Sequence, residues 1–211
     1  FSLDEGRIPQ VYAVGIKELW EIPPGRCEPG TIVHTMGYPL RSEEFGGGFI
    51  YALPEGRLSI GFVAGLDYRD PKFDPHVAFQ RFKQHPFVSA LLNGGQMIRY
   101  GAKALPEGGW HAIPRCHVDG ALIIGDAAGF LNSLRLKGIH LGMRSGMCAA
   151  EAAFDAVRTG DLSAASLERY WQLVNSGEIR RELYPVRNVH QSFGRGLVWG
   201  LLYSGLSLIT G

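Results

Sequence analysis

The sequence lacks an excess of charge of either sign. Its 211 residues carry 21 Lys and Arg against 20 Asp and Glu, a formal net charge of +1. Binding to nucleic-acid phosphates needs a basic surface, so no nucleic-acid partner is expected. Cysteine is also scarce, and Cys27, Cys116 and Cys148 are odd in number and far apart. They form neither a disulfide framework nor a CxxC metal motif, which favours a reducing compartment.

The sequence also lacks an apolar run long enough to cross a membrane as a helix. Gly196–Gly211 has sixteen residues without a charge, whereas a spanning helix needs about 20. It is either an interfacial or re-entrant segment or a buried helix, and both alternatives stay open. The opening residues FSLDEGRIPQ lack a starting Met and the pattern of a signal or transit peptide. Neither end resembles the natural end of a protein, so a fragment is expected.

What is present is a globular composition with many turns. Hydrophobic residues make up 45% and charged residues 19%, and there are 29 Gly and 12 Pro. Runs rich in β-branched and aromatic residues predict strands. These runs are Val11–Ile22, Thr31–Tyr38, Gly48–Leu53, Leu58–Leu66, Met97–Leu105 and Ala121–Gly125.

Helices are predicted near 74–93. Asp74 is typical of an N-cap before a first-turn proline, and His85-Pro86 separates two helical stretches. The fold class expected from these elements is α/β (α+β), with a twisted, mostly antiparallel sheet packed by helices.

From Lys137 the apolar spacing becomes helical. Gly138, Gly142, Gly146 and Ala150 repeat every four residues, and such a small-residue stripe allows close approach to a strand or a ligand. We expect it to be buried. Beside it, one helix face is predicted to hold Ile139, Met143, Met147, Ala150, Phe154 and Val157. A second helix is predicted over roughly 162–175.

The most informative stretch is Ala121–Ala150. An apolar strand ends at Gly125-Asp126, a loop of small residues follows, and a Gly-rich helix begins. This order presents backbone N–H groups and a helix dipole to an anion. It also places the Asp126 carboxylate where it could accept hydrogen bonds from sugar-alcohol hydroxyls. The alternative is an ordinary strand-loop-helix connection with a capping Asp.

The same stretch resembles the second FAD-binding motif of the electron-transfer flavoprotein:ubiquinone oxidoreductase family. That motif is a strand-GxxxGFxN loop followed by KGxHxxMxSGxxAAE. Here the loop is Gly125–Asn132 and the helix start is Lys137–Glu151. Other segments agree in order along nearly the whole chain: Gly15–Ile22, His34–Leu40, Phe45–Tyr51, Val63–Tyr68, Phe79–Pro86, Gly94–Ala104, Glu107–Trp110 and Glu182–Asn188.

The resemblance implies a flavin site and a quinone site. The cofactor-binding residues would be Gly125, Asp126, Gly129, Asn132, Lys137, Gly138, Ile139 and His140, with His140 beside the cofactor and not catalytic. The quinone would lie beside Gly46 and Gly47. Independently of the resemblance, a planar apolar ring needs aromatic or aliphatic walls, which Tyr38, Phe45 and Phe49 could supply. A glycine bulge or turn entering a strand is the structural alternative for Gly46 and Gly47. No catalytic residue and no metal ligand are assigned.

In that family electrons pass from reduced electron-transfer flavoprotein through FAD to ubiquinone, and a 4Fe-4S cluster is also present. This sequence has no GxGxxG turn for the ADP half of FAD. It has no set of four cysteines, so the cluster would not be ligated by this chain. Asp126 stands where the family often has Cys, and there it resembles the wider glutathione-reductase-like flavoprotein group.

Three segments are expected from the resemblance. Residues 1–118 would form a quinone- or substrate-binding domain, 119–176 part of a glutathione-reductase-like FAD domain, and 177–211 an apolar, membrane-contacting segment. The partners implied are electron-transfer flavoprotein, ubiquinone as substrate and a membrane surface. The location implied is peripheral, on the bacterial cytoplasmic membrane or the mitochondrial inner membrane.

Two alternative functions stay open at this point. One is a FixC-like or geranylgeranyl-reductase-like flavoenzyme. The other is a non-catalytic quinone- or lipid-binding module, which the missing ADP-binding turn favours for the isolated chain. The parent protein would be an oxidoreductase, and the fragment alone is expected to be inactive.

Overall fold

The computed structural model describes residues 1–135, 137–192 and 196–210 and divides into two compact units. The sheet unit is Tyr12–Leu105, and the helical unit joins Phe1–Val11 to Pro106–Gly211. This differs from the expected first domain, which ran from residue 1 to 118. The reason is a long-range pairing: the Glu107 N–H donates to the Val11 carbonyl over 2.7 Å. The first residues of the chain therefore join the segment that follows residue 105.

The sheet unit is built on five strands in the order β2-β3-β4-β1-β5. Strand β4 pairs antiparallel with both β1 and β3, and β3 pairs antiparallel with β2. The strands are β1 (Tyr12–Glu21), β2 (Ile32–Thr35), β3 (Gly46–Leu53), β4 (Arg57–Gly65) and β5 (Gln96–Pro106). The expected mixed fold with an antiparallel sheet is confirmed.

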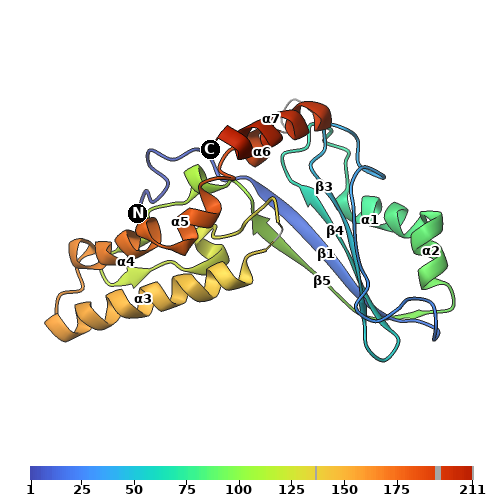
Figure 1. Ribbon diagram of the computed structural model, residues 1–211, viewed down its shortest axis with the longest axis horizontal. Helices are drawn as coiled ribbons and strands as arrows, with labels where there is room; N and C mark the ends of the chain where they lie inside the picture. The colour runs from blue at the N-terminus through green and yellow to red at the C-terminus, as the bar shows by residue number, and fades with distance from the viewer. Residues whose placement is uncertain (136, 193–195, 211) are drawn as a thin grey trace. The chain divides into compact units, whose positions relative to one another are not determined.

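Two short helices, α1 (Pro75–Gln84) and α2 (Pro86–Leu92), lie on one face of this sheet (Figure 1). The Asp74 carboxylate caps α1 by accepting from the backbone N–H groups of His76 and Val77. His85 ends α1 and caps α2, and Pro86 fits the first turn of α2 because that position needs no N–H donor.

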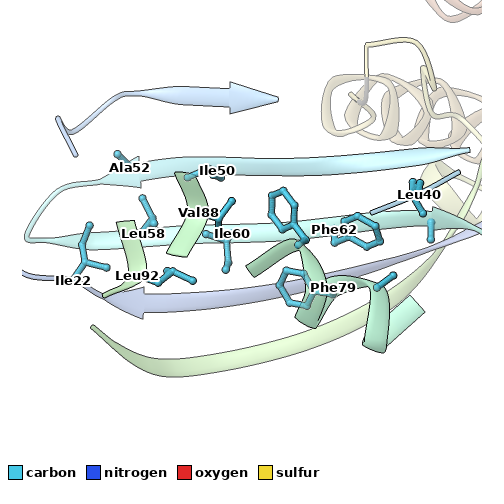
Figure 2. Packing of buried hydrophobic residues seen from close by; sticks show 13 residues of the cluster. Ile22, Leu40, Ile50, Ala52, Leu58, Ile60, Phe62, Phe79, Val88 and Leu92 are labelled. Atoms are coloured by element: carbon cyan, nitrogen blue, oxygen red, sulfur yellow. The ribbon is translucent and has the colours of Figure 1, made fainter. Parts of the chain in front are cut away.

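Strand alternation divides the sheet into a buried face and an open face. Ile60 and Phe62 of β4 point toward the helices, and Figure 2 shows them beside Phe79 of α1. The aromatic residues of the 76–92 segment thus belong mainly to the core, since Phe79 and Phe82 are buried. The whole buried cluster is Ile22, Leu40, Ile50, Ala52, Leu58, Ile60, Phe62, Ala64, Ala78, Phe79, Phe82, Val88 and Leu92.

The helical unit begins with short elements and continues with helices. The strand expected over Ala121–Gly125 is only two residues long, because Gly125 already has φ +59° and starts a turn. The elements are η1 (Trp110–Ala112), β6 (His117–Val118), β7 (Ala121–Leu122), η2 (Gly125–Ala128), α3 (Ile139–Thr159), α4 (Ala164–Ser176), α5 (Glu178–Leu183), α6 (Val189–Ser192) and α7 (Leu197–Thr210).

Helix α7 presents an apolar surface. Ser204 is buried and its hydroxyl lies 2.8 Å from the Ser192 hydroxyl of α6. Large apolar side chains are exposed elsewhere on α7: Val198, Trp199, Leu201, Leu202, Tyr203 and Leu206. Within the described ranges, no helix combines the length and the hydropathy that a membrane crossing requires.

Helix α3 buries a different face from the one its spacing predicted. Leu141, Ser145, Cys148, Ala152 and Ala156 are buried, with Leu141 in the same cluster as Tyr170 of α4. The predicted face is exposed, with fractions of 85% at Ile139, 68% at Met143 and 61% at Met147. The helix carries two apolar sets at helical spacing, and periodicity alone does not decide which set meets the core.

The glycine stripe of α3 is close-packed only near its start. A Cβ built on Gly138 would lie 2.9 Å from the Leu131 side chain, and one on Gly142 would lie 3.7 Å from Gly125 Cα. A Cβ on Gly146 would meet no described atom within 4 Å. All three glycines are half-buried, so the predicted burial of the stripe is only partial, and Gly138 and Gly142 contact a neighbouring segment while Gly146 does not.

Gly146→Ala should stabilise the 211-residue chain. Glycine in the interior of a helix costs about 0.5–1 kcal/mol relative to alanine, and here the added methyl has room. Gly48→Ala should instead destabilise, since its Cβ would lie 2.5 Å from the Phe82 ring. Urea denaturation measures both changes, and a loss of stability in Gly146→Ala would contradict the placement of this face.

Candidate functional site

The predicted cofactor segment folds into a tight turn facing the start of α3. Gly125 and Gly129 have φ of +59° and +82°, values that favour glycine because a Cβ is strained there. The turn η2 lies between these two glycines. The chain thereby reverses directly after β7 and exposes Ile124 and Ala127.

A single buried hydroxyl fastens this turn to α3. The Gly125 N–H donates to Ser145 Oγ over 2.9 Å, and Ser145 Oγ donates to the Gly142 carbonyl over 2.7 Å. Ser145 is fully buried. A Cβ on Gly142 would lie 3.7 Å from Gly125 Cα, so the two backbones approach closely. Ser145 stands in the SG pair of the family motif, and the sequence predicted no role for it.

The first turn of α3 has backbone N–H groups and a carboxylate beside it. Gly138 is the N-cap and, among the described residues, no side chain caps the helix. The Asp126 carboxylate lies next to Gly138, with Oδ1 3.2 Å from the position of a Cβ there. The positive end of the helix dipole favours an anion or a polar group at this place. Ile139 and His140 are exposed at the same end.

Asn132 shapes the loop that leads into α3. Its backbone exchanges hydrogen bonds with Lys137, over 2.9 Å and 3.2 Å, so the loop closes on itself. Its buried side chain accepts from the Arg135 N–H and donates to Glu182 Oε1 over 3.0 Å. Both ends of the amide are therefore used inside the protein, while Lys137 is exposed.

Glu182 of α5 is part of the site although the sequence analysis assigned it no role. Its Oε2 lies 2.7 Å from His140 Nε2. Burial raises the pKa of Glu182, but hydrogen bonds from His140 and Asn132 and the charge of Arg135 outweigh it, so the pKa is lowered. The carboxylate is therefore ionised at neutral pH. A contact across 42 residues of sequence leaves no local signal.

The eight predicted cofactor residues form one neighbourhood at the start of α3. The structure brings Gly125 and Asp126 against Gly138 and Gly142, and it leaves His140 exposed beside them. These residues fit a flavin. The glycines allow the backbone close to a flat ring system, the helix end offers N–H groups, and Asp126 offers an acceptor for ribityl hydroxyls.

The predicted quinone residues lie in the sheet unit, near the start of β3. The Phe45 carbonyl accepts from the Gly65 N–H over 2.8 Å. A Cβ on Gly47 would lie 2.2 Å from the Thr35 carbonyl, and one on Gly46 would lie 2.1 Å from the Val63 carbonyl. Both glycines are therefore needed for strand packing, whatever else they do. Tyr38 lies against α1, where its hydroxyl donates to the Arg81 carbonyl over 3.4 Å.

A pocket of about 640 Å³ opens on the sheet face away from the helices. Val63, which lines it, is the direct cross-strand partner of Gly47. Phe49 lies across Gly61, where a Cβ would come within 2.1 Å of its ring. The pocket is also lined by Gly15, Leu19, Leu53 and Leu105, with Lys17, Arg99 and Lys103 among its polar residues.

A second pocket of about 840 Å³ lies beside α1. Trp20 and Tyr100 line it, and its polar side holds a buried pair in which Lys83 Nζ lies 2.8 Å from Glu18 Oε1. The Trp20 indole N–H also donates to this carboxylate over 2.8 Å. The pair is fully hydrogen-bonded, which explains how a glutamate 5% exposed is accommodated.

The sheet unit matches a known family. Residues 12–105 fit the family described as "ETF-QO, ubiquinone-binding". Several relatives named mitochondrial electron transfer flavoprotein-ubiquinone oxidoreductase align with nearly the whole chain. The protein from Oryza sativa subsp. japonica is 45% identical over 197 residues, covering 93% of this chain and 34% of its own length. The human protein is 39% identical, covering 98% and 35%.

The chain belongs to the electron transfer flavoprotein-ubiquinone oxidoreductase family. It spans about a third of the length of the curated relatives that it matches.

Solved flavoproteins share its fold at low identity. A geranylgeranyl bacteriochlorophyll reductase-like protein from Thermoplasma acidophilum superposes with a TM-score of 0.71 at 16% identity, covering 94% of this chain and 46% of that one. A flavin-dependent brominase superposes with a TM-score of 0.56 at 19% identity, covering 94% and 47%. These likenesses support the fold expected from the sequence.

Proposed function

We propose that this chain is part of an oxidoreductase that passes electrons from reduced electron-transfer flavoprotein through FAD to ubiquinone. The sheet unit binds ubiquinone, and the helical unit holds the isoalloxazine side of FAD. The 4Fe-4S cluster of the parent protein is ligated outside these residues. The similarity to electron transfer flavoprotein-ubiquinone oxidoreductases and the ubiquinone-binding match over 12–105 support this function.

The observation that carries the flavin assignment is the approach of Gly125 to Gly142 beside Asp126. When bound, FAD accepts and passes on the electrons. The residues of this chain bind and orient it: the amides at the start of α3 face its polar edge, and Asp126 accepts from its ribityl hydroxyls. His140 lies beside the cofactor and is not assigned a proton transfer.

The quinone assignment rests on the start of β3 and the open-face pocket. Gly46 and Gly47 pack against the neighbouring strands, and Val63, the cross-strand partner of Gly47, connects the start of β3 to the pocket. Phe45 is proposed as an aromatic wall on the β3 side. A quinone headgroup is flat and mostly apolar, which suits an apolar floor with few polar groups. Tyr38 lies against α1 and does not line the open-face pocket, so its proposed contact with the quinone is limited to the start of β3.

The exposed side chains of α7 support contact with a membrane surface. The helix has 14 residues, which at about 1.5 Å per residue is shorter than the hydrocarbon core of a bilayer. Trp199 and Tyr203 are residue types that favour the interface. The protein is therefore proposed to be peripheral, on the mitochondrial inner membrane or the bacterial cytoplasmic membrane.

The isolated 211-residue chain should bind FAD weakly or not at all and should be inactive. Its sequence has no GxGxxG turn for the ADP half of the cofactor. Joining it to the dinucleotide-binding segment of a curated relative should yield a yellow protein. In that protein Asp126→Ala should weaken FAD binding about ten-fold, measured by flavin fluorescence titration. Tight stoichiometric FAD in the isolated chain would contradict the proposed division of the site.

Filling the open-face pocket should block quinone reduction selectively. In the protein with a complete flavin site, Val63→Trp should raise the KM for ubiquinone at least about ten-fold. Flavin reduction by electron-transfer flavoprotein should persist, because the donor does not use this pocket. Ile32→Trp, at a position 65% exposed on β2, is the matched control. Equal loss of both half-reactions with a lowered melting temperature would remove the support for this pocket.

Charge on the exposed face of α7 should weaken membrane association. Leu202→Asp should lower partitioning onto vesicles of phosphatidylcholine and cardiolipin about ten-fold. The substitution removes an apolar side chain that would be buried in the membrane interface and replaces it with a charged one. Phe154→Asp on α3, where the side chain is 68% exposed, is the control and should change little. If both variants lost vesicle binding equally in a flotation assay, α7 would not be the membrane contact.

A further inference from the structure

Glu182 contacts both ends of the loop that the proposed flavin site uses. Its Oε1 accepts from Asn132 Nδ2 over 3.0 Å, and its Oε2 lies 2.7 Å from His140 Nε2. Asn132 follows the turn after Gly129, and His140 belongs to the first turn of α3. One carboxylate on α5 thus joins the two sides of the 132–140 loop.

The arrangement around this carboxylate is shielded and specific. Asn132 is 1% exposed, and the Glu182 side chain is 20% exposed. Among the described residues of the loop, no other side chain forms a hydrogen bond with α5. Hydrogen bonds to a charged acceptor are stronger than neutral ones, and they fix direction as well as distance. Glu182 therefore determines where the loop amide and the exposed imidazole lie.

We propose that Glu182 is a positioning residue of the flavin site, which acts by holding Asn132 and His140 in the arrangement that receives the cofactor. The inference rests on the proposed function for the location of the flavin. It adds a residue that lies in another helix, 42 positions after His140. Glu182 acts through its two partners and is assigned no contact with the reacting ring.

The chain offers a matched control one turn earlier on the same helix. Glu178 pairs with Arg144, and Oε2 lies 3.5 Å from Nε. Both side chains are more exposed, at 64% and 41%. This second pair also joins α5 to α3, but it lies one turn further along α3 and contacts none of the described side chains of residues 132–140. A variant of Glu178 therefore distinguishes a general loss of contact between α5 and α3 from a specific effect on the 132–140 loop.

The first measurement is FAD affinity in the chain joined to a relative's dinucleotide-binding segment. Glu182→Ala should weaken binding about ten-fold, because both partners lose their acceptor. Glu182→Gln should stay within about three-fold of the unchanged protein, since its amide can accept from Asn132 and donate to the neutral imidazole. Glu178→Ala should leave the affinity unchanged.

The second measurement needs no cofactor. Amide hydrogen exchange in the 211-residue chain should rise at 129–132 and 137–142 in Glu182→Ala, relative to the second half of α3. Glu178→Ala should not produce this local pattern. Glu182→Gln should restore the protection.

The outcomes separate this inference from the proposed function. If Asp126→Ala weakens FAD binding and Glu182→Ala does not, the flavin site stands and the positioning role is wrong. If Glu182→Ala and Glu178→Ala weaken it equally, or Glu182→Gln fails to restore it, the role is again wrong. If neither Asp126→Ala nor Glu182→Ala changes FAD affinity, the flavin assignment itself fails.

Discussion

The buried Ser145 hydroxyl is the contact on which the helical unit's site depends. It accepts from the Gly125 amide and donates to the Gly142 carbonyl, so it joins the turn after β7 to the second turn of α3. The two backbones approach closely here, since a Cβ on Gly142 would lie 3.7 Å from Gly125 Cα, and the φ of +59° at Gly125 favours glycine. The turn that carries Asp126 is thereby attached to the helix whose first turn follows the 132–137 pairing. A cofactor with a polar edge and a flat ring suits this arrangement.

The sheet unit also provides a surface suited to a flat ligand, but it does so with a packed core behind an open strand face. Its helix-covered face is a close-packed core of aliphatic and aromatic side chains (Figure 2), and its other face carries the pocket lined by Val63 and Phe49. Glycines at the start of β3 let three strands approach closely, and Phe49 lies flat across Gly61. A packed core behind an apolar open face gives a rigid support for a flat, weakly polar ligand. The two units thus divide the proposed electron path into a flavin part and a quinone part.

Local signals in the sequence predicted most of the elements. The strands of the sheet, the Asp74 cap and the break at His85-Pro86 follow from neighbouring residues alone, and the structure confirms them. The family motif predicted which segment carries the proposed cofactor residues, and their contacts with FAD remain a proposal.

Long-range contacts explain what the sequence did not predict. Nothing local indicates that Val11 pairs with Glu107 or that Glu182 meets His140. The prediction of which face of α3 is buried was wrong for a related reason. Two apolar sets of side chains share the helix, and only the position of α4 and α5 selects the one containing Leu141 and Cys148.

Hydrogen exchange with each ligand in turn tests the division between the units most directly. In the chain completed with a dinucleotide-binding segment, FAD should protect the amides at 125–129 and 137–142 and leave the sheet unit unchanged. A short-chain ubiquinone should then protect the start of β3 and the facing part of β4. Protection of the sheet strands by FAD, or of the α3 start by ubiquinone alone, would contradict the account.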